Sequence, residues 1–204
     1  MKRSSKESSQ KLYEIAEAQQ GFFTTKQALT AGYAENTHPY HVNAGNWIRE
    51  HRGIYRLANF PIFDESELVL WSLWSRNRQG IPQAVYSHET ALDLHDLSDL
   101  MPSKLHITVP LNFRRGSGIP EVLILHRAQL PEIDIEIRQG FRVTTALRTI
   151  VDLLKEGTVT MDIIKQALRE AVGRGIITRS AIRRTGISPA VREKIEGLIQ
   201  EINK

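Results

Sequence analysis

The order of local structure signals in the first sixty residues constrains the fold more than any other feature of this chain. Three helical patterns come first, and a glycine follows each of them: residues 9–20, 26–31 and 36–44. Pro39 is compatible with the third helix only in its first turn, so that helix should begin close to Thr37. Two strand-like segments, 47–52 and 54–57, then flank Gly53, which suits a tight turn. Three short helices followed by a hairpin predict a winged helix-turn-helix.

A winged helix-turn-helix places its third helix in the major groove of DNA, where exposed polar side chains meet base edges. The polar residues of the predicted third helix are Asn36, Thr37, Tyr40, His41 and Asn43. The hairpin adds groups suited to phosphates or the minor groove: Arg49, His51, Arg52 and Arg56. We interpret these nine residues as the DNA-binding set. The alternative is a protein-docking winged helix on which the same residues are only solvated.

The remaining length is sufficient for a second domain with its own core. Strand-like segments lie at Leu105–Val109, Val122–Leu125 and Ile133–Arg138, and helical patterns close the chain. We therefore predict an α+β protein, in which a winged helix-turn-helix precedes a mixed helix and antiparallel-sheet domain. The expected divisions are a disordered segment 1–8, a DNA-binding domain 9–60, and a second domain 61–204.

Charge is concentrated in two regions of a chain whose formal net charge is only +4. One is the amino-terminal module. The other is residues 165–194, where eight lysines and arginines stand against two glutamates. We expect Lys165, Arg169, Arg183 and Arg184 to form a surface that meets an anionic partner. The alternative is an ordinary solvated helical face.

Four histidines of the second domain are candidates for chemistry: His88, His95, His106 and His126. Their spacing matches no metal-binding motif, so ordinary polar roles are the simpler interpretation. Ser87 is explained as a helix cap. Zero cysteines exclude disulfides and thiolate sites. We expect no catalytic residues, no cofactor and no metal.

Two charged patterns are also candidate sites. Asp134 and Glu136 resemble a nuclease carboxylate pair, but the lysine expected two residues later is Arg138. Arg148 and Asp152 are spaced for an ion pair within one helix. A nuclease-related enzyme is therefore a weak alternative. Because no apolar run is long enough to span a bilayer and no signal peptide is evident, we expect a cytoplasmic protein.

Three segments together resemble the AbiEi-type antitoxins of type IV toxin–antitoxin, or phage-abortive, systems. They are the amino-terminal module with its Ala31-Gly32-Tyr33 turn and Arg52–Leu57 hairpin, the stretch from Tyr86 to Pro110 containing Ser-His-Glu-Thr-Ala-Leu, and Gly140–Leu154. The similarity covers about residues 9 to 175. Nothing after 175 contributes to it.

This resemblance implies a non-enzymatic DNA-binding repressor that binds promoter repeats of its own operon. It also implies that the second domain neutralises a nucleotidyltransferase-like toxin encoded alongside, typically without a stable complex. The alternative is a standalone winged-helix regulator whose second domain binds a ligand or a protein.

Overall fold

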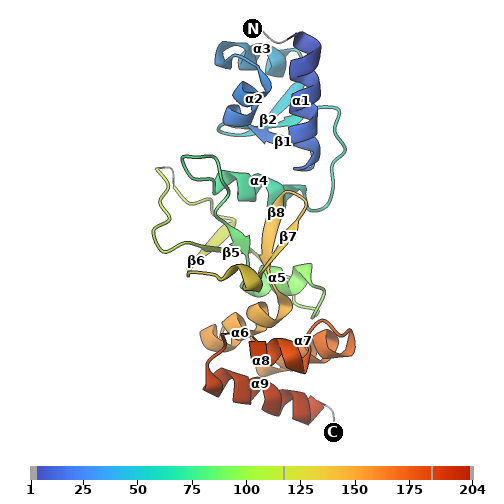
Figure 1. Ribbon diagram of the computed structural model, residues 1–204, viewed down its shortest axis with the longest axis vertical. Coiled ribbons are helices and arrows are strands. Elements are labelled where there is room, and N and C mark those ends of the chain that lie inside the picture. The colour runs from blue at the N-terminus through green and yellow to red at the C-terminus, as the bar shows by residue number, and fades with distance from the viewer. Residues whose placement is uncertain (1–3, 117, 185, 203–204) are drawn as a thin grey trace. The chain divides into compact units, whose positions relative to one another are not determined.

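The computed structural model describes residues 4–116, 118–184 and 186–202, and the chain divides into two compact units (Figure 1). The amino-terminal unit comprises the residues up to Ala84 together with Arg138–Phe141. The carboxy-terminal unit comprises Val85–Ile137 and the residues from Arg142 onward. Among the described helices, none combines the length and apolarity that a membrane crossing requires.

The first two helices of the amino-terminal unit are both fixed by capping boxes. Helix α1 spans Ser5–Glu17, with the Ser4 hydroxyl accepting from the Glu7 amide and the Glu7 carboxylate accepting from the Ser4 amide. Residues 5–8, which we expected to be disordered, are therefore helical. Helix α2 spans Thr25–Ala31 and has the equivalent box at its start. Gly32 ends α2 with a φ of 112°, the left-handed conformation that glycine adopts most easily.

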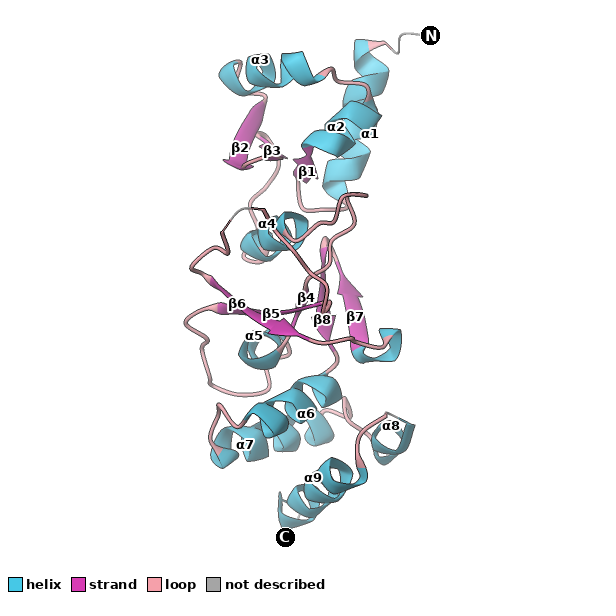
Figure 2. Ribbon diagram, turned by 90° about the vertical axis from the view of Figure 1, so that its left-hand side faces the viewer, coloured by secondary structure: helices cyan, strands magenta, loops and turns pink. Residues whose placement is uncertain are grey.

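The third helix and the hairpin have the order predicted from the sequence. A short 3-10 turn, Glu35–Thr37, leads into α3, His38–Asn43, with Pro39 in its first turn. Strands β2 (Trp47–His51) and β3 (Ile54–Leu57) form the hairpin. A strand that the sequence did not predict, β1 at Phe22–Thr24, pairs with β3, so that the sheet order is β1-β3-β2 (Figure 2). This arrangement confirms the winged helix.

The core of this unit is aromatic, and it is formed by the helices and the sheet together. Trp47 packs edge-on against Phe23, with 4.9 Å between ring centroids. Leu12 and Ala16 of α1 and Ala28 of α2 are buried in the same cluster. Helix α4, Ser66–Trp74, completes the unit. The module is therefore held by burial of apolar area, the main favourable contribution to folding.

The carboxy-terminal unit contains a mixed sheet with the order β6-β5-β4-β8-β7. Its strands are β4 (Val85–Tyr86), β5 (Leu105–Val109), β6 (Leu123–Arg127), β7 (Ile135–Arg138) and β8 (Phe141–Thr144). Strand β5 runs antiparallel to β4 but parallel to β6, and β4 runs parallel to β8. The α+β class is confirmed, with parallel pairs that the alternation of one strand could not predict.

Helices complete this unit, and Figures 1 and 2 both show α5 between the sheet and α6. They are α5 (His88–Leu94), α6 (Ala146–Glu156), α7 (Met161–Gly173), α8 (Arg179–Arg184) and α9 (Pro189–Ile202), with a 3-10 turn at Glu132–Asp134. Their apolar faces meet in one cluster that includes Leu92, Ile150 and Leu168. This packing holds α5 against both the sheet and α6, and these elements carry the histidine cluster described below.

Candidate nucleic-acid interface and a histidine cluster

Helix α3 and the 3-10 turn before it carry three exposed polar side chains. Asn36, Tyr40 and Asn43 are exposed, and Tyr40 reaches 68% exposure. A tyrosine so exposed has an apolar ring and a hydroxyl available to a partner. These residues lie where a winged helix meets base edges.

Two other residues predicted on this helix are engaged within the protein. The hydroxyl of Thr37 donates to the carbonyl of Ala34 at 2.7 Å. His41 stacks on Trp47, with ring centroids 4.6 Å apart and planes 21° from parallel, and burial lowers the pKa of His41. Both side chains position the helix in this structure.

The arginines of the hairpin occupy two different environments. Arg49 and Arg52 are exposed. Arg56 is only 7% exposed, and its Nε donates to Oε1 of Glu50 at 2.8 Å. A second bond runs from Arg56 to the carbonyl of Phe60. Its burial follows from its place on β3, the middle strand of the sheet. The structure thus does not present Arg56 to a phosphate.

His51, the remaining hairpin residue of the predicted set, is half-buried. Its ring meets the edge of Trp71 of α4, with centroids 5.8 Å apart. One exposed polar residue outside the set predicted from the sequence is Asn46, directly before β2. Its place after Gly45, at the junction of helix and wing, was the available signal.

The basic residues predicted on the last helices differ in their surroundings. Lys165 of α7 pairs with Glu201 of α9 at 3.0 Å, but both groups are well exposed, so the pair contributes little stability. Arg169 and Arg183 are exposed. The side chain of Arg184 lies outside the described part of the chain.

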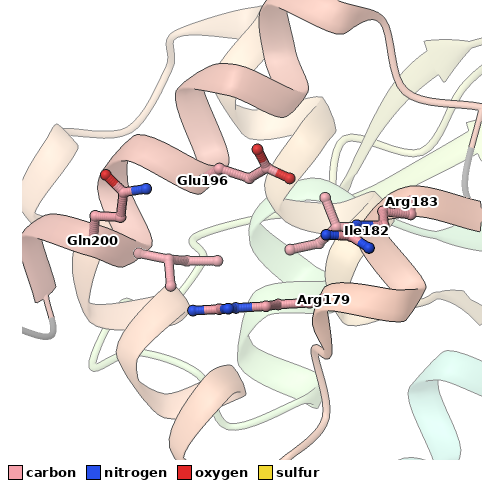
Figure 3. A pocket seen from close by; sticks show the side chains of 6 residues that line it. Arg179, Ile182, Arg183, Glu196 and Gln200 are labelled. Carbon is pink, nitrogen blue, oxygen red and sulfur yellow. The ribbon is translucent and has the colours of Figure 1, made fainter.

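A hollow of about 190 Å³ lies between α8 and α9 and includes one of these predicted residues (Figure 3). Arg179 and Arg183 of α8 line it together with Glu196 and Gln200 of α9, and Ile182 lies between the two arginines in sequence. The hollow therefore contains two cations and one anion. It is less uniformly positive than the sequence indicated.

The carboxy-terminal unit brings together three histidines that are far apart in the sequence. His88 begins α5, His106 lies on β5, and His126 lies on β6. The rings of His88 and His126 stack with centroids 3.6 Å apart, and Nδ1 of His106 lies 3.0 Å from Nε2 of His126. Their spacing in the sequence matches no metal-binding motif, yet the fold brings these three rings together. His95 lies apart from them, with its Nε2 2.7 Å from the carbonyl of Thr144.

One carboxylate, at the end of α6, faces two of these rings. Oε2 of Glu156 lies 3.4 Å from Nε2 of His88, and its Oε1 lies 3.3 Å from Nδ1 of His126. In the parallel pairing of β5 with β6, Thr108 lies opposite His126. His106 precedes Thr108 by two residues on β5, so it lies on the same face of the sheet and next to His126. This pairing could not be inferred from the spacing of the histidines in the sequence.

Ser87 belongs to this cluster, and the prediction that its side chain caps α5 is wrong. Its hydroxyl makes no capping bond. Instead, Oγ of Ser87 lies 2.9 Å from Nδ1 of His88 and accepts a hydrogen bond from Thr108 at 2.8 Å. The backbone of His88 has a φ of 53°, a left-handed conformation that is uncommon for residues other than glycine.

Burial keeps two of the three histidines, His88 and His106, uncharged. Desolvation, followed by the nearby His126, His106 and Arg148, lowers the pKa of His88 to about 3. Desolvation and His126 lower the pKa of His106 to about 4, against the opposing influence of Glu156. Both rings are therefore neutral near pH 7, the form in which an imidazole nitrogen has a free lone pair.

The charged pairs singled out from the sequence have structural partners. Arg148 donates from Nε to Asp152 at 2.9 Å, which confirms the predicted pair, and from Nη1 to buried Asp134 at 3.1 Å. Burial alone would lower the pKa of Arg148, but its bonds and charge interactions with the two aspartates raise it. Asp134 lies in a 3-10 turn before β7, so it does not alternate with Glu136 along one strand.

Comparison with known proteins finds a family similarity in the amino-terminal module. Residues 10–58 match the model of the family described as "Transcriptional regulator, AbiEi antitoxin". These residues are therefore similar to the AbiEi module of that family. The resemblance stated from the sequence is confirmed over this segment, and the resemblance of the two later segments stays a prediction.

The overall fold also has a counterpart among solved structures. The crystal structure of the RV2827C protein from Mycobacterium tuberculosis is similar with a TM-score of 0.59. The alignment covers 100% of this chain and 80% of that one, at 12% sequence identity, and so concerns the fold alone. No curated protein matches the chain.

Proposed function

We propose that this protein is a DNA-binding antitoxin that represses its own operon and neutralises a nucleotidyltransferase-like toxin. The observation that carries the proposal is the AbiEi module at residues 10–58, with an exposed polar face on its third helix and two exposed arginines on its wing. A helix with free polar groups beside basic residues suits a major groove and its flanking phosphates.

Helix α3 and the wing contribute different kinds of contact to DNA in this proposal. Helix α3, with the sequence HPYHVN, contains no lysine or arginine, so it contributes little to the attraction of phosphates. That attraction falls to Arg49 and Arg52 of the wing. Asn36, Tyr40 and Asn43 are left to discriminate bases, a role for which asparagine is suited because it can bond adenine at two positions.

The first test compares two double variants of the full-length protein on DNA from upstream of its own gene and on random duplex. We expect Arg49→Ala/Arg52→Ala to weaken binding to both DNAs and to reduce the slope of log affinity against log salt by about 1.8, or about 0.9 for each phosphate that an arginine no longer neutralises. Tyr40→Ala/Asn43→Ala should weaken binding to the upstream DNA by about 1–3 kcal/mol for each base that is read and leave random DNA nearly unaffected. Fluorescence anisotropy across a salt series measures both effects.

Arg179→Ala, on α8 of the other unit, is the control for removal of an exposed arginine and should bind both DNAs normally. If the wing double variant keeps the wild-type affinity and salt slope, the wing does not hold phosphates. Equal weakening of the Tyr40/Asn43 variant on both DNAs would contradict base reading by α3.

The alternative function is a standalone winged-helix regulator whose second domain binds a ligand or a protein. The family description supports an antitoxin, whereas a regulator would need no toxin gene beside its own. Co-expression with the product of the neighbouring gene separates the two functions. Growth arrest that this protein relieves supports the antitoxin.

A further inference from the structure

We propose that His88, His126 and Glu156 form a binding site for a divalent transition-metal ion such as Zn²⁺ in the carboxy-terminal unit. This site is independent of the proposed DNA binding. The three side chains offer two imidazole nitrogens and one carboxylate oxygen, all within 4.8 Å of one another. Two histidines and one carboxylate form a common ligand set for zinc and for non-haem iron.

The distances between these atoms suit an ion better than they suit direct hydrogen bonds. The carboxylate oxygens lie 3.4 and 3.3 Å from the facing nitrogens of His88 and His126. Charge-assisted N–H···O bonds are shorter, about 2.7–2.9 Å. Two ligand atoms bound tetrahedrally to zinc at about 2.0–2.1 Å are about 3.3–3.4 Å apart, the separation found here between each nitrogen and the oxygen that faces it. Since the two nitrogens face different oxygens, the carboxylate would bind through both oxygens or turn to bring one of them to the ion. The rings of His88 and His126 lie only 15° from parallel, so they must turn out of this stacked arrangement before both in-plane lone pairs can meet at one ion.

Neighbouring groups orient both imidazoles as ligands. If Nε2 of His126 donates to Nδ1 of His106, then Nδ1 of His126 directs its lone pair toward Glu156. His106 then carries its own proton on Nε2, which faces the carboxylate of Glu89 at 3.8 Å. A ligating histidine whose other ring N–H donates a hydrogen bond in this way is the usual arrangement around protein-bound metals.

The same holds for His88. Its Nδ1 faces the hydroxyl of Ser87, which Thr108 fixes with a second bond, and its Nε2 faces Glu156. His88, the first residue of α5, has a left-handed backbone. This conformation is unfavourable for a residue other than glycine, and such strain is often found at functional sites. A serine nucleophile is a poorer explanation of this geometry, because Ser87 is 0% exposed and no substrate reaches it.

The surroundings leave the site open on one side. The side chain of Glu156 is 34% exposed, and a hollow of about 290 Å³ borders the cluster. Arg127, Arg148 and Lys155 also line this hollow. An ion with three protein ligands retains a fourth position for solvent or an exchangeable ligand. Asp152, which pairs with Arg148, also lines the hollow and offsets part of its positive charge.

The test uses full-length protein treated with a chelator and then titrated with Co²⁺, whose visible absorption reports its ligand geometry, and with Zn²⁺ in competition. We expect one ion per chain, bound with a tetrahedral-type spectrum and displaced by Zn²⁺. Glu156→Gln and His126→Gln should abolish that spectrum. Ser87→Ala should weaken affinity by about ten- to a hundredfold, the usual effect of removing a group that orients a ligand.

Glu121→Gln, an exposed acid of the same unit outside the cluster, is the matched control and should bind as wild type does. Circular dichroism checks that each variant is folded. A measurement on the wild-type protein does not depend on the folding of any variant. In NMR spectra, Zn²⁺ should shift the ring signals of His88 and His126 and leave those of His38 unchanged. The proposal is overturned if the wild type binds no Co²⁺, if Glu156→Gln and His126→Gln bind it normally, or if the cluster signals do not move.

Discussion

Arg52 and Arg56 are alike in the sequence, yet the wing places them in opposite environments. Arg52 is exposed beside the turn, whereas Arg56 lies on the middle strand and is paired with Glu50. The sequence shows that both belong to a hairpin. It does not show that β1 covers the second side of β3, because three residues, Phe22–Thr24, are too short a strand pattern to recognise. Which arginine is free could therefore not be predicted.

Replacing Arg56 should lower stability, whereas replacing Arg52 should not. Arg56→Ala leaves Glu50 without its partner in a partly buried place, and we expect a decrease of about 1–3 kcal/mol in the free energy of unfolding. Arg52→Ala, an exposed substitution, should stay within about 0.5 kcal/mol of the wild type. Urea unfolding followed by tryptophan fluorescence measures the difference, because all three tryptophans, Trp47, Trp71 and Trp74, lie in the amino-terminal unit. Equal stabilities of the two variants would show that the ion pair contributes nothing.

At the scale of elements, local rules predicted the boundaries of α2 and α3 closely but placed both ends of α1 too far along the chain. Gly32 and Gly45 follow α2 and α3 as predicted, because glycine readily takes the left-handed conformation found at both. The start of α1 was missed because the capping box of Ser4 and Glu7 lies in a polar segment without apolar periodicity. Capping depends on hydrogen bonds between neighbours, whereas periodicity depends on the core, and here the two signals do not coincide.

Helix α3 begins at a buried histidine, which makes the module sensitive to acid. His38 packs against Trp47 and Tyr55, with ring centroids 5.2 and 5.9 Å away. Burial lowers the pKa of His38 below 6.5, and the charge of nearby His41 adds to this; Glu35 and a backbone bond at Tyr33 oppose it. The unfolded chain therefore binds a proton near pH 6.5, where the folded chain does not.

Stability should consequently fall as pH is lowered from 7 through 6.5 toward the depressed pKa of the folded state, because the unfolded state binds more protons in that window. His38→Phe keeps an aromatic ring without the titration, so its stability should fall less steeply from pH 7 to pH 5. Thermal unfolding of the full-length protein, followed by tryptophan fluorescence, gives both slopes. Carboxylates and His41 remain in both proteins, so the difference isolates His38. Parallel pH profiles would contradict this role.

For the whole molecule, the sequence was informative wherever function depends on one contiguous segment. Residues 5–57 contain every element of the winged helix in order, so the module could be predicted apart from β1. The histidine cluster draws on α5, β5, β6 and α6, and it depends on a parallel pairing of β5 and β6. A parallel pair needs a long connection, so its register leaves no local signal in the sequence. The division at residue 60 stays a prediction. The two compact units divide the chain between Ala84 and Val85 instead.

The last prediction separates repression from antitoxicity within the intact chain, and it rests on the proposed function. Arg169 and Arg183 are exposed on α7 and α8. If these residues meet an anionic partner, Arg169→Glu/Arg183→Glu should abolish rescue of cells from the toxin, since like charges then face each other. Repression of the promoter should persist, because the winged helix is untouched.

The matched control is Lys104→Glu/Arg114→Glu, which reverses two exposed cations elsewhere in the same unit and changes the net charge equally. It should repress and rescue normally. A toxin-expressing strain with a promoter reporter measures both activities at matched protein abundance. Full rescue by the Arg169/Arg183 variant would place the antitoxic surface elsewhere. Equal failure of both variants would mean that antitoxicity requires overall positive charge, because a long-range attraction depends on summed charge whereas a direct contact depends on position.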